Sequence, residues 1–248
     1  MSGHSKWATI KRKKGAADAK RGKMFTKLIK EITIAAREGG GDPGGNPRLR
    51  LAVDNAKAAN MPADNIERAI KKATGELEGV TYHELVYEGY GPAGVALMVE
   101  VATDNKNRTV ADIRHSFTRY GGSLAETGAV AWMFERKGII SLPEQNKTEE
   151  DLMNIVLDAG AEDLQLEDGY FSIQTDLESF EPVRKALIAA ALELENASLQ
   201  WIAKNNISIK GDEAEKVMKL IEAIEDNDDV QNVFTNADID EETINQTS

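Results

Sequence analysis

The sequence contains no cysteine, and only 6% of its residues are aromatic. Without cysteine the chain cannot form a disulfide scaffold, a zinc ribbon, a thiol nucleophile or an iron–sulfur cluster. No apolar run approaches the roughly 18 residues of a membrane span, and the basic N-terminal residues are not followed by an apolar stretch of signal-peptide length. We therefore expect a cytoplasmic protein with no membrane partner.

Charge is distributed unevenly along the 248 residues. Residues 1–75 hold 17 Lys and Arg against 7 Asp and Glu, a balance of +10, and residues 76–248 hold 13 against 35, a balance of -22, so the two sum to -12. Such an uneven charge distribution indicates that the two parts of the chain have different roles. We expect a basic module that faces a polyanion, and an acidic remainder that repulsion keeps away from it.

The basic segment has the pattern of a small helical bundle. Between residues 18 and 37 one helix face is apolar and the opposite face is basic. The apolar positions are Phe25, Leu28, Ile29, Ile32 and Ala36, and the basic positions are Lys20, Lys23, Lys27 and Lys30. After a glycine-rich loop at residues 39–47, a second helix buries Leu49, Ala52, Val53 and Ala56, and a third follows Pro62 and ends at Gly75. We expect the lysine face to be solvated.

Alternating and β-branched residues begin after Val80 and predict an α/β region. Strands are expected at 82–88, 95–102 and 129–135, with a helix at 107–119. A β-α-β-β-α-β order follows, which is typical of a ferredoxin-like sandwich; its elements are 138–142, 149–159, 162–167, 170–175, 180–193 and 197–203. A helix at 213–225 and a strand at 230–235 follow this sandwich and, together with the elements before it, make up a second α/β domain.

The predicted fold class is α+β and multidomain, with an N-terminal three-helix domain and two α/β, ferredoxin-like domains, one inserted in the other. The predicted bounds are 1–78 for the basic helical domain, 79–135 plus 206–238 for the outer α/β domain, and 136–205 for the inserted domain. The acidic end of the chain lacks apolar periodicity from Asn236 on. We expect a disordered tail, assigned to residues 239–248.

The N-terminal cations are the main candidates for nucleic-acid binding, because lysine contacts phosphate as an adaptable point charge and a tryptophan can stack on a base. They are Lys6, Trp7, Lys11, Arg12, Lys13, Lys14, Lys20, Arg21, Lys23, Lys27, Lys30, Arg48 and Arg50. A solvated charged tail is the alternative. Second-rank candidates are His4, Lys106, Asn107 and Arg108. For the last three, a helix start capped by Asp104 or Asn105 is the structural alternative.

No catalytic constellation is present in the sequence. Gly89 to Gly94 match the spacing of a dinucleotide fingerprint, but a strand follows, whereas the fingerprint requires a helix; we expect a hairpin connection. His4, His83 and His115 lack the spacing of metal ligands or of a triad. We expect no enzyme activity, cofactor, metal or small-molecule substrate.

Several strings resemble the YebC/PmpR family. They include Ser2-Gly3-His4-Ser5-Lys6-Trp7, Asn60-Met61-Pro62-Ala63-Asp64-Asn65-Ile66 and Tyr87-Glu88-Gly89-Tyr90-Gly91-Pro92. The likeness extends from Ser2 to about Gly138, although Ala125 and Ala129 depart from the family's glycine block. The resemblance implies three domains, one inserted in another. It also implies a probable transcriptional regulator that binds promoter DNA, or a translation factor that associates with the ribosome.

Two nucleic-acid targets stay open at this point. The family naming favours duplex DNA. A flexible basic arm, the lack of a base-reading recognition helix and the lack of a dimerisation device favour ribosomal RNA, and predict a monomer. A protein adaptor whose basic arm binds an acidic partner is a further alternative.

Overall fold

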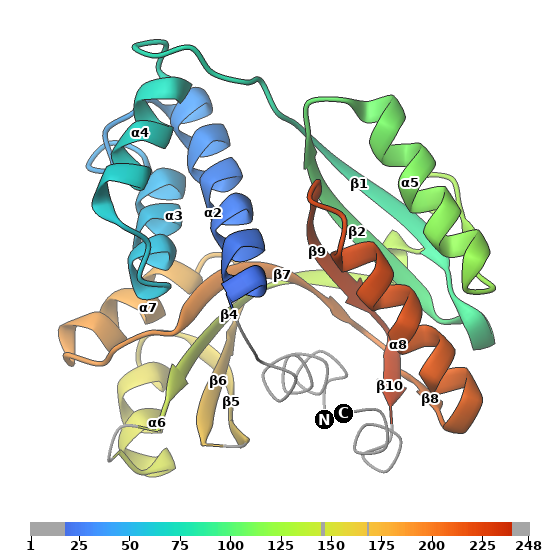
Figure 1. Cartoon of the computed structure of the whole chain (residues 1–248). Helices are drawn as coiled ribbons and strands as arrows, with labels where there is room; N and C mark the ends of the chain where they lie inside the picture. Colours follow the sequence, from blue (N-terminus) through green and yellow to red (C-terminus); the bar gives the residue numbers. More distant parts are fainter. Residues whose placement is uncertain (1–17, 145–146, 168, 240–248) are drawn as a thin grey trace.

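The computed structural model describes residues 18–144, 147–167 and 169–239, and side chains from residue 21 on. The described chain forms three units (Figure 1): a helical unit, a middle unit and an inserted unit. Each has its own buried apolar cluster. The predicted α+β multidomain class is confirmed.

The helical unit consists of α2 (Asp18–Gly39), α3 (Pro47–Ala58) and α4 (Ala63–Ala73). The buried members of its core all lie between residues 32 and 73 and include Ile32, Leu49 and Ile66. Asn46 caps α3, because its Oδ1 accepts from Leu49 N–H at 3.0 Å. Its amide also donates to Ala35 O at 2.7 Å, which fixes the glycine loop against α2. The three predicted helices and the apolar stripe of the first are confirmed.

The middle unit has a four-stranded sheet of order β3-β1-β2-β9, with two helices on one face (Figure 1). Its elements are β1 (His83–Tyr90), β2 (Ala96–Thr103), α5 (Lys106–Arg119), β3 (Ser123–Leu124), α8 (Gly211–Glu225) and β9 (Val230–Thr235). The turn at Pro92–Gly94 connects antiparallel β1 and β2, with Ala93 in the left-handed region at φ 56. The predicted hairpin is therefore confirmed at the glycine motif.

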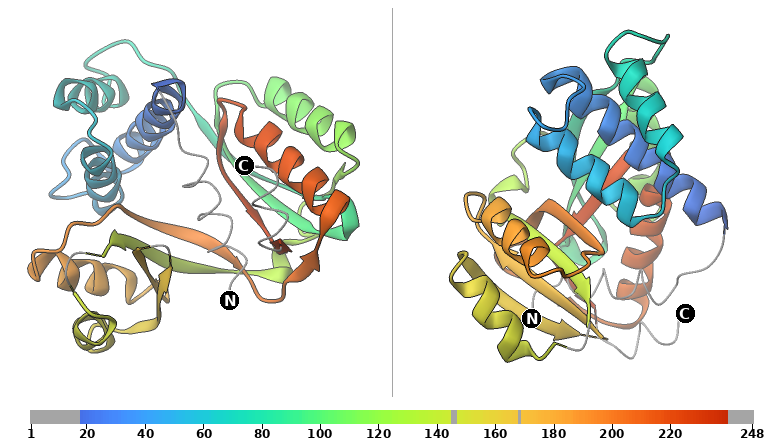
Figure 2. Two further views of the ribbon diagram at one scale, coloured as in Figure 1. Left: turned by 60° about the horizontal axis from the view of Figure 1, so that its bottom comes forward. Right: turned by 90° about the vertical axis from the view of Figure 1, so that its left-hand side faces the viewer.

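The inserted unit lies between β3 and α8 in the sequence and has the strand order β5-β6-β4-β7. Its elements are β4 (Phe134–Pro143), α6 (Glu149–Leu157), β5 (Ala161–Glu167), β6 (Tyr170–Thr175), α7 (Phe180–Ala189) and β7 (Asn196–Ala203). All three strand pairings are antiparallel. The ferredoxin-like order and the insertion are confirmed, and Figure 2 shows the inserted unit beside both other units.

The predicted strand at 129–135 is wrong. Residues Ala131–Met133 form a 3₁₀ turn and β4 begins only at Phe134. The buried Glu88 carboxylate accepts the N–H groups of Gly128, Val130 and Ala131 at 2.7, 2.7 and 2.9 Å, so these groups are not available to a strand ladder. Burial raises the pKa of Glu88, but these three backbone hydrogen bonds outweigh it and hold the pKa below its ordinary value.

The predicted disorder from Asn236 is also wrong for the first residues of that segment. Asn236 is buried, and its Oδ1 accepts from Ala96 N–H at 2.7 Å. Residues Ala237–Ile239 form β10, which pairs in parallel with β8 (Ile207–Ile209), a strand that the sequence pattern did not predict. The remainder of the predicted tail, residues 240–248, lies outside the described residues.

The two sheet units meet through an apolar interface. Its buried residues are Ala96, Met98, Val130, Phe134 and Phe234. The helical unit contacts the inserted unit differently: the Asn55 side chain pairs with both backbone groups of Ala197, at 2.8 and 3.2 Å, and Asp54 forms a salt bridge with the buried Arg184 at 2.8 Å. Among the described helices, none combines the length and apolar character that crossing a membrane requires.

Candidate nucleic-acid interface

The lysine row of α2 faces the end of α8 and the loop that follows it. We call residues 225–229 the acidic loop; they are Glu225, the last residue of α8, and Asp226, Asn227, Asp228 and Asp229 after it. Lys23 Nζ lies 2.9 Å from Asp226 Oδ1, Lys27 Nζ donates to Glu225 O at 3.5 Å, and Lys30 Nζ lies 2.8 Å from Asp229 Oδ1. Lys23 and Lys30 pair with carboxylates and Lys27 with a backbone carbonyl; we call this contact between the helical unit and the middle unit the lysine–carboxylate interface.

The prediction of a solvated lysine face is wrong at Lys30, whose side chain is only 7% exposed, and wrong in part at Lys27, which is half-buried. The Lys30 ammonium also donates to Ala102 O at 3.0 Å and Asp228 O at 2.8 Å, and lies 5.3 Å from the centroid of the Tyr82 ring. Helical spacing correctly directed Lys30 away from the bundle core, but the middle unit occupies that side. We therefore do not retain Lys30 as a nucleic-acid contact.

Asp229 is the centre of this buried network. Besides Lys30, it accepts from Thr103 Oγ1 at 3.0 Å, Arg108 Nη2 at 2.7 Å and Thr109 Oγ1 at 2.7 Å. Burial raises the pKa of Asp229, but the hydrogen bonds from Arg108, Lys30 and Thr109 outweigh it and place the pKa far below its usual range. One carboxylate therefore connects α2, the end of β2 and the start of α5.

Three other candidates, Arg48, Arg50 and Arg108, contact acceptors within the protein. Arg48 contacts Glu31, Glu38 and Glu84 at 2.9, 2.7 and 2.6 Å. Burial lowers the pKa of Arg48, but the hydrogen bonds to Glu84 and Glu31 outweigh it and raise the pKa above its ordinary value. We do not retain Arg48, since three carboxylates already neutralise its charge.

Arg50 donates to Pro43 O and Gly44 O, each at 2.9 Å, and so fastens the glycine loop. Arg108 contacts Asp104 and Asp229 at 2.8 and 2.7 Å. Asn105 Oδ1 accepts from Arg108 N–H at 3.1 Å, so the helix-cap interpretation of this segment is confirmed. Arg50 and Arg108 thus have structural partners.

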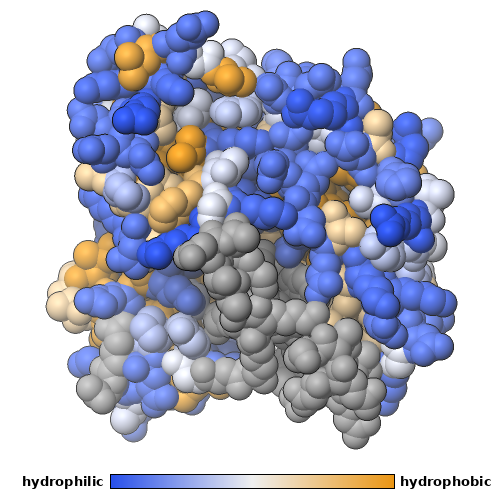
Figure 3. Space-filling model, in the orientation of Figure 1, coloured by the Kyte–Doolittle hydropathy of each residue, from blue (hydrophilic) through white to orange (hydrophobic). Residues whose placement is uncertain are grey.

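Some cations of the helical unit remain at its surface. Arg21 is exposed, with its guanidinium carbon 5.9 Å from the centroid of the Phe25 ring. Lys57, Arg68 and Lys72 are exposed and form no ion pair with another described residue. Figure 3 shows mostly hydrophilic residues over the helical unit. The side chain of Lys20 and the candidates His4, Lys6, Trp7, Lys11, Arg12, Lys13 and Lys14 lie outside the described residues.

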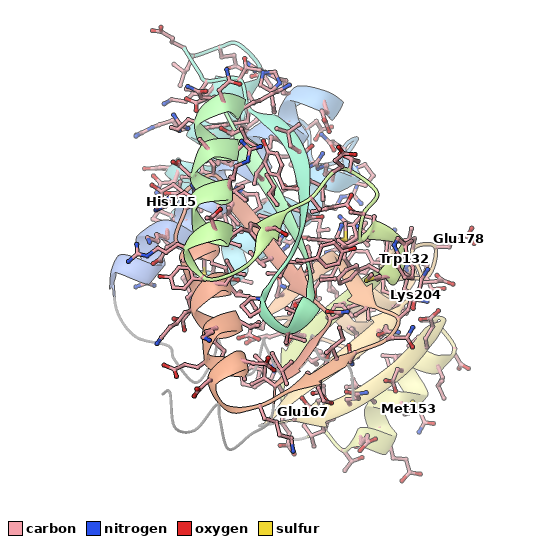
Figure 4. All side chains as sticks on the ribbon, turned by 90° about the vertical axis from the view of Figure 1, so that its right-hand side faces the viewer. His115, Trp132, Met153, Glu167, Glu178 and Lys204 are labelled. Carbon is pink, nitrogen blue, oxygen red and sulfur yellow. The ribbon has the colours of Figure 1, made fainter. Side chains whose placement is uncertain are left out.

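Lys106 and Asn107 are exposed at the start of α5. Sequence reasoning also passed over Trp132, which is 66% exposed. Its indole N–H donates to Ala129 O at 3.0 Å, and Lys204 Nζ donates to its carbonyl at the same distance. Trp132 and Lys204 lie close together in Figure 4. No spacing in the sequence distinguishes an exposed tryptophan from a core one.

Comparison with known proteins identifies relatives over the whole chain. Residues 5–76 match the TACO1/YebC protein N-terminal domain, and residues 82–237 match the TACO1/YebC second and third domain. A "Probable transcriptional regulatory protein" of Chlorobium chlorochromatii is 59% identical over 100% of both chains. One with the same name from Pelodictyon phaeoclathratiforme is 61% identical over 97% of both.

A solved structure agrees with the architecture. The crystal structure of a conserved hypothetical protein from Aquifex aeolicus aligns with a TM-score of 0.84 and 47% identity, covering 90% of this chain and 93% of that one. The chain is thus a three-unit α+β protein in which one sheet unit is inserted in another, and it matches its relatives along its whole length. This chain belongs to the TACO1/YebC family.

Proposed function

We propose that this protein is a non-enzymatic regulator of gene expression that binds nucleic acid through its basic N-terminal part. The observation that carries the proposal is the separation of charge, +10 in residues 1–75 against -22 in residues 76–248. A phosphate backbone attracts the first part and repels the second, which orients the protein on a polyanion. The proposed contacts are Lys6, Trp7, Lys11, Arg12, Lys13, Lys14, Lys20 and Arg21.

Promoter DNA is the first candidate target, because relatives of this chain are named probable transcriptional regulatory proteins. RNA is the second candidate, and the position of α2 favours it. A helix that reads a DNA groove needs a free face. One face of α2 packs in the bundle core, and the buried Lys30–Asp229 pair holds the opposite face against the acidic loop.

The test is the salt dependence of binding to a labelled DNA duplex and a labelled RNA, measured by fluorescence anisotropy. The variant replaces Lys11, Arg12, Lys13 and Lys14 by Gln. We expect this variant to bind more weakly. On the duplex, the slope of log affinity against log salt concentration should be shallower by about 3 to 4, because each phosphate contact contributes about 0.9 to that slope.

The matched control replaces Lys147, Lys185, Lys216 and Lys219 by Gln, which removes the same charge from the two sheet units. The control should bind like the unmodified protein. Equal losses in both variants would contradict a directed interface and indicate a response to net charge alone. Competition with unlabelled DNA or RNA then identifies the preferred target.

A further inference from the structure

The lysine–carboxylate interface has one buried end and one exposed end. The Lys30 and Asp229 side chains are 7% and 8% exposed, whereas those of Lys23 and Asp226 are 44% and 77% exposed. An ion pair in water contributes only about 0 to 1 kcal/mol, and an external anion can replace its carboxylate. The buried pair instead anchors α2. The exposed pair can therefore open while the buried pair stays in place.

The acceptors at the exposed end resemble the oxygens of a polyanion. Lys23 contacts both the Asp226 carboxylate and the Asp226 carbonyl, at 2.9 and 3.3 Å, and the half-buried Lys27 beside it donates to the Glu225 carbonyl at 3.5 Å. These carbonyls end helix α8, where the helix dipole adds partial negative charge. A nucleic-acid backbone offers lysine the same kind of contact, with closely spaced anionic oxygens.

The surroundings of this contact permit an exchange of partners. All buried members of the helical-unit core lie between residues 32 and 73, and those of the middle-unit core start at Val95. No buried apolar residue of either cluster is thus shared across the lysine–carboxylate interface. Moving Lys23 and Lys27 from the acidic loop to phosphates needs new side-chain rotamers and leaves both cores intact.

We propose that the acidic loop is an autoinhibitory contact, in which Asp226 and the carbonyl end of α8 occupy Lys23 and Lys27 until a nucleic-acid backbone displaces them. This inference rests on the proposed function and adds its regulation. Lys23 and Lys27 are then nucleic-acid contacts that are masked in the free protein, adjacent to Lys20 and Arg21.

The direct test locks the contact covalently. Because the chain contains no cysteine, Lys23→Cys combined with Asp226→Cys introduces the only two thiols. One sample is closed with a short bismaleimide, and a second sample of the same variant is capped with N-ethylmaleimide. We expect the closed sample to bind a labelled oligonucleotide about two- to fivefold more weakly than the capped sample, because only Lys27 differs in accessibility between the two. Equal affinities would overturn the autoinhibitory contact.

A second variant tests the competition without cross-linking. Asp226→Asn should raise oligonucleotide affinity by about two- to fivefold at low salt, the range expected from one exposed ion pair. The control Asp212→Asn removes the same charge from the other, exposed end of α8. An equal gain in both variants would overturn the proposal. If the capped sample and the unmodified protein bind no nucleic acid at all, the proposed function itself fails, which is a different result from equal affinities.

Discussion

The two interfaces of the middle unit differ in chemistry. Towards the inserted unit it buries Met98, Phe134 and Phe234, which form an apolar interface. Towards the helical unit it offers Asp226 and Asp229 to lysines of α2. Ion pairs are screened by salt and respond to pH, whereas apolar side chains carry no charge to screen or titrate. The middle unit is therefore joined to the inserted unit by apolar packing, and to the helical unit by ion pairs.

The largest effect is expected at the apolar interface. Phe134→Ala should lower the free energy of unfolding by about 4 kcal/mol, because Phe134 is 3% exposed and its removal leaves a cavity. Urea denaturation measures this loss. Leu177→Ala, at a side chain that is 51% exposed, is the control and should change stability little. A loss below 1 kcal/mol for Phe134→Ala would mean that the two sheet units are not held by this packing.

The buried end of the lysine–carboxylate interface should respond nearly as strongly. Asp229→Asn removes the counter-charge of Lys30 and Arg108, and the unpaired buried ammonium should cost about 3 kcal/mol in unfolding free energy. Asp226→Asn, in the same loop but 77% exposed, is the matched control and should cost under about 0.5 kcal/mol. Equal costs would contradict the distinction between a buried anchor and an exposed contact.

Acid should weaken the same interface. The pKa of Asp229 is lowered in the folded state, so the unfolded state binds more protons as pH falls. Its contribution is fully present above the unfolded pKa of about 4 and is lost as pH falls towards the folded pKa. We expect stability to decline below pH of about 4, and to decline less steeply in Asp229→Asn, by on the order of 1 kcal/mol at pH 3. Parallel pH profiles from urea denaturation would contradict this.

The smallest effect is expected at the exposed end. Lys23→Ala should change unfolding free energy by under about 0.5 kcal/mol, since water screens its contact with Asp226. Thermal unfolding at low and high salt measures it. A large loss would indicate that Lys23 is part of the structural anchor, and that nucleic acid cannot displace its partner.

Local patterns predicted much of this fold. The spacing of Leu49, Ala52 and Ala56 identified one side of the helical bundle, and the strand expected at 170–175 is β6 of the structure. The strand at 129–135 was mispredicted because a carboxylate distant in sequence, Glu88, holds the backbone of the Gly128 loop.

The candidate interface was less predictable for a physical reason. Helical spacing defines which face of α2 carries lysines, but it does not reveal what faces them. Lys30 and Asp229 are 199 residues apart in sequence, and no local pattern connects them. The same limit applies to Arg48, whose partners Glu31 and Glu84 lie on different elements. The pattern of charges along a helix identifies its basic face. Tertiary packing decides which cations on that face already pair with carboxylates of the same chain.

Lysine acetylation with and without saturating oligonucleotide, read by mass spectrometry, measures which lysines nucleic acid covers. We expect nucleic acid to protect Lys6, Lys11, Lys13, Lys14 and Lys20, and to leave Lys147, Lys185 and Lys216 equally reactive. Lys30 should be unreactive in both samples, because it is buried. Protection of lysines in the two sheet units, with the N-terminal lysines unchanged, would contradict this expectation.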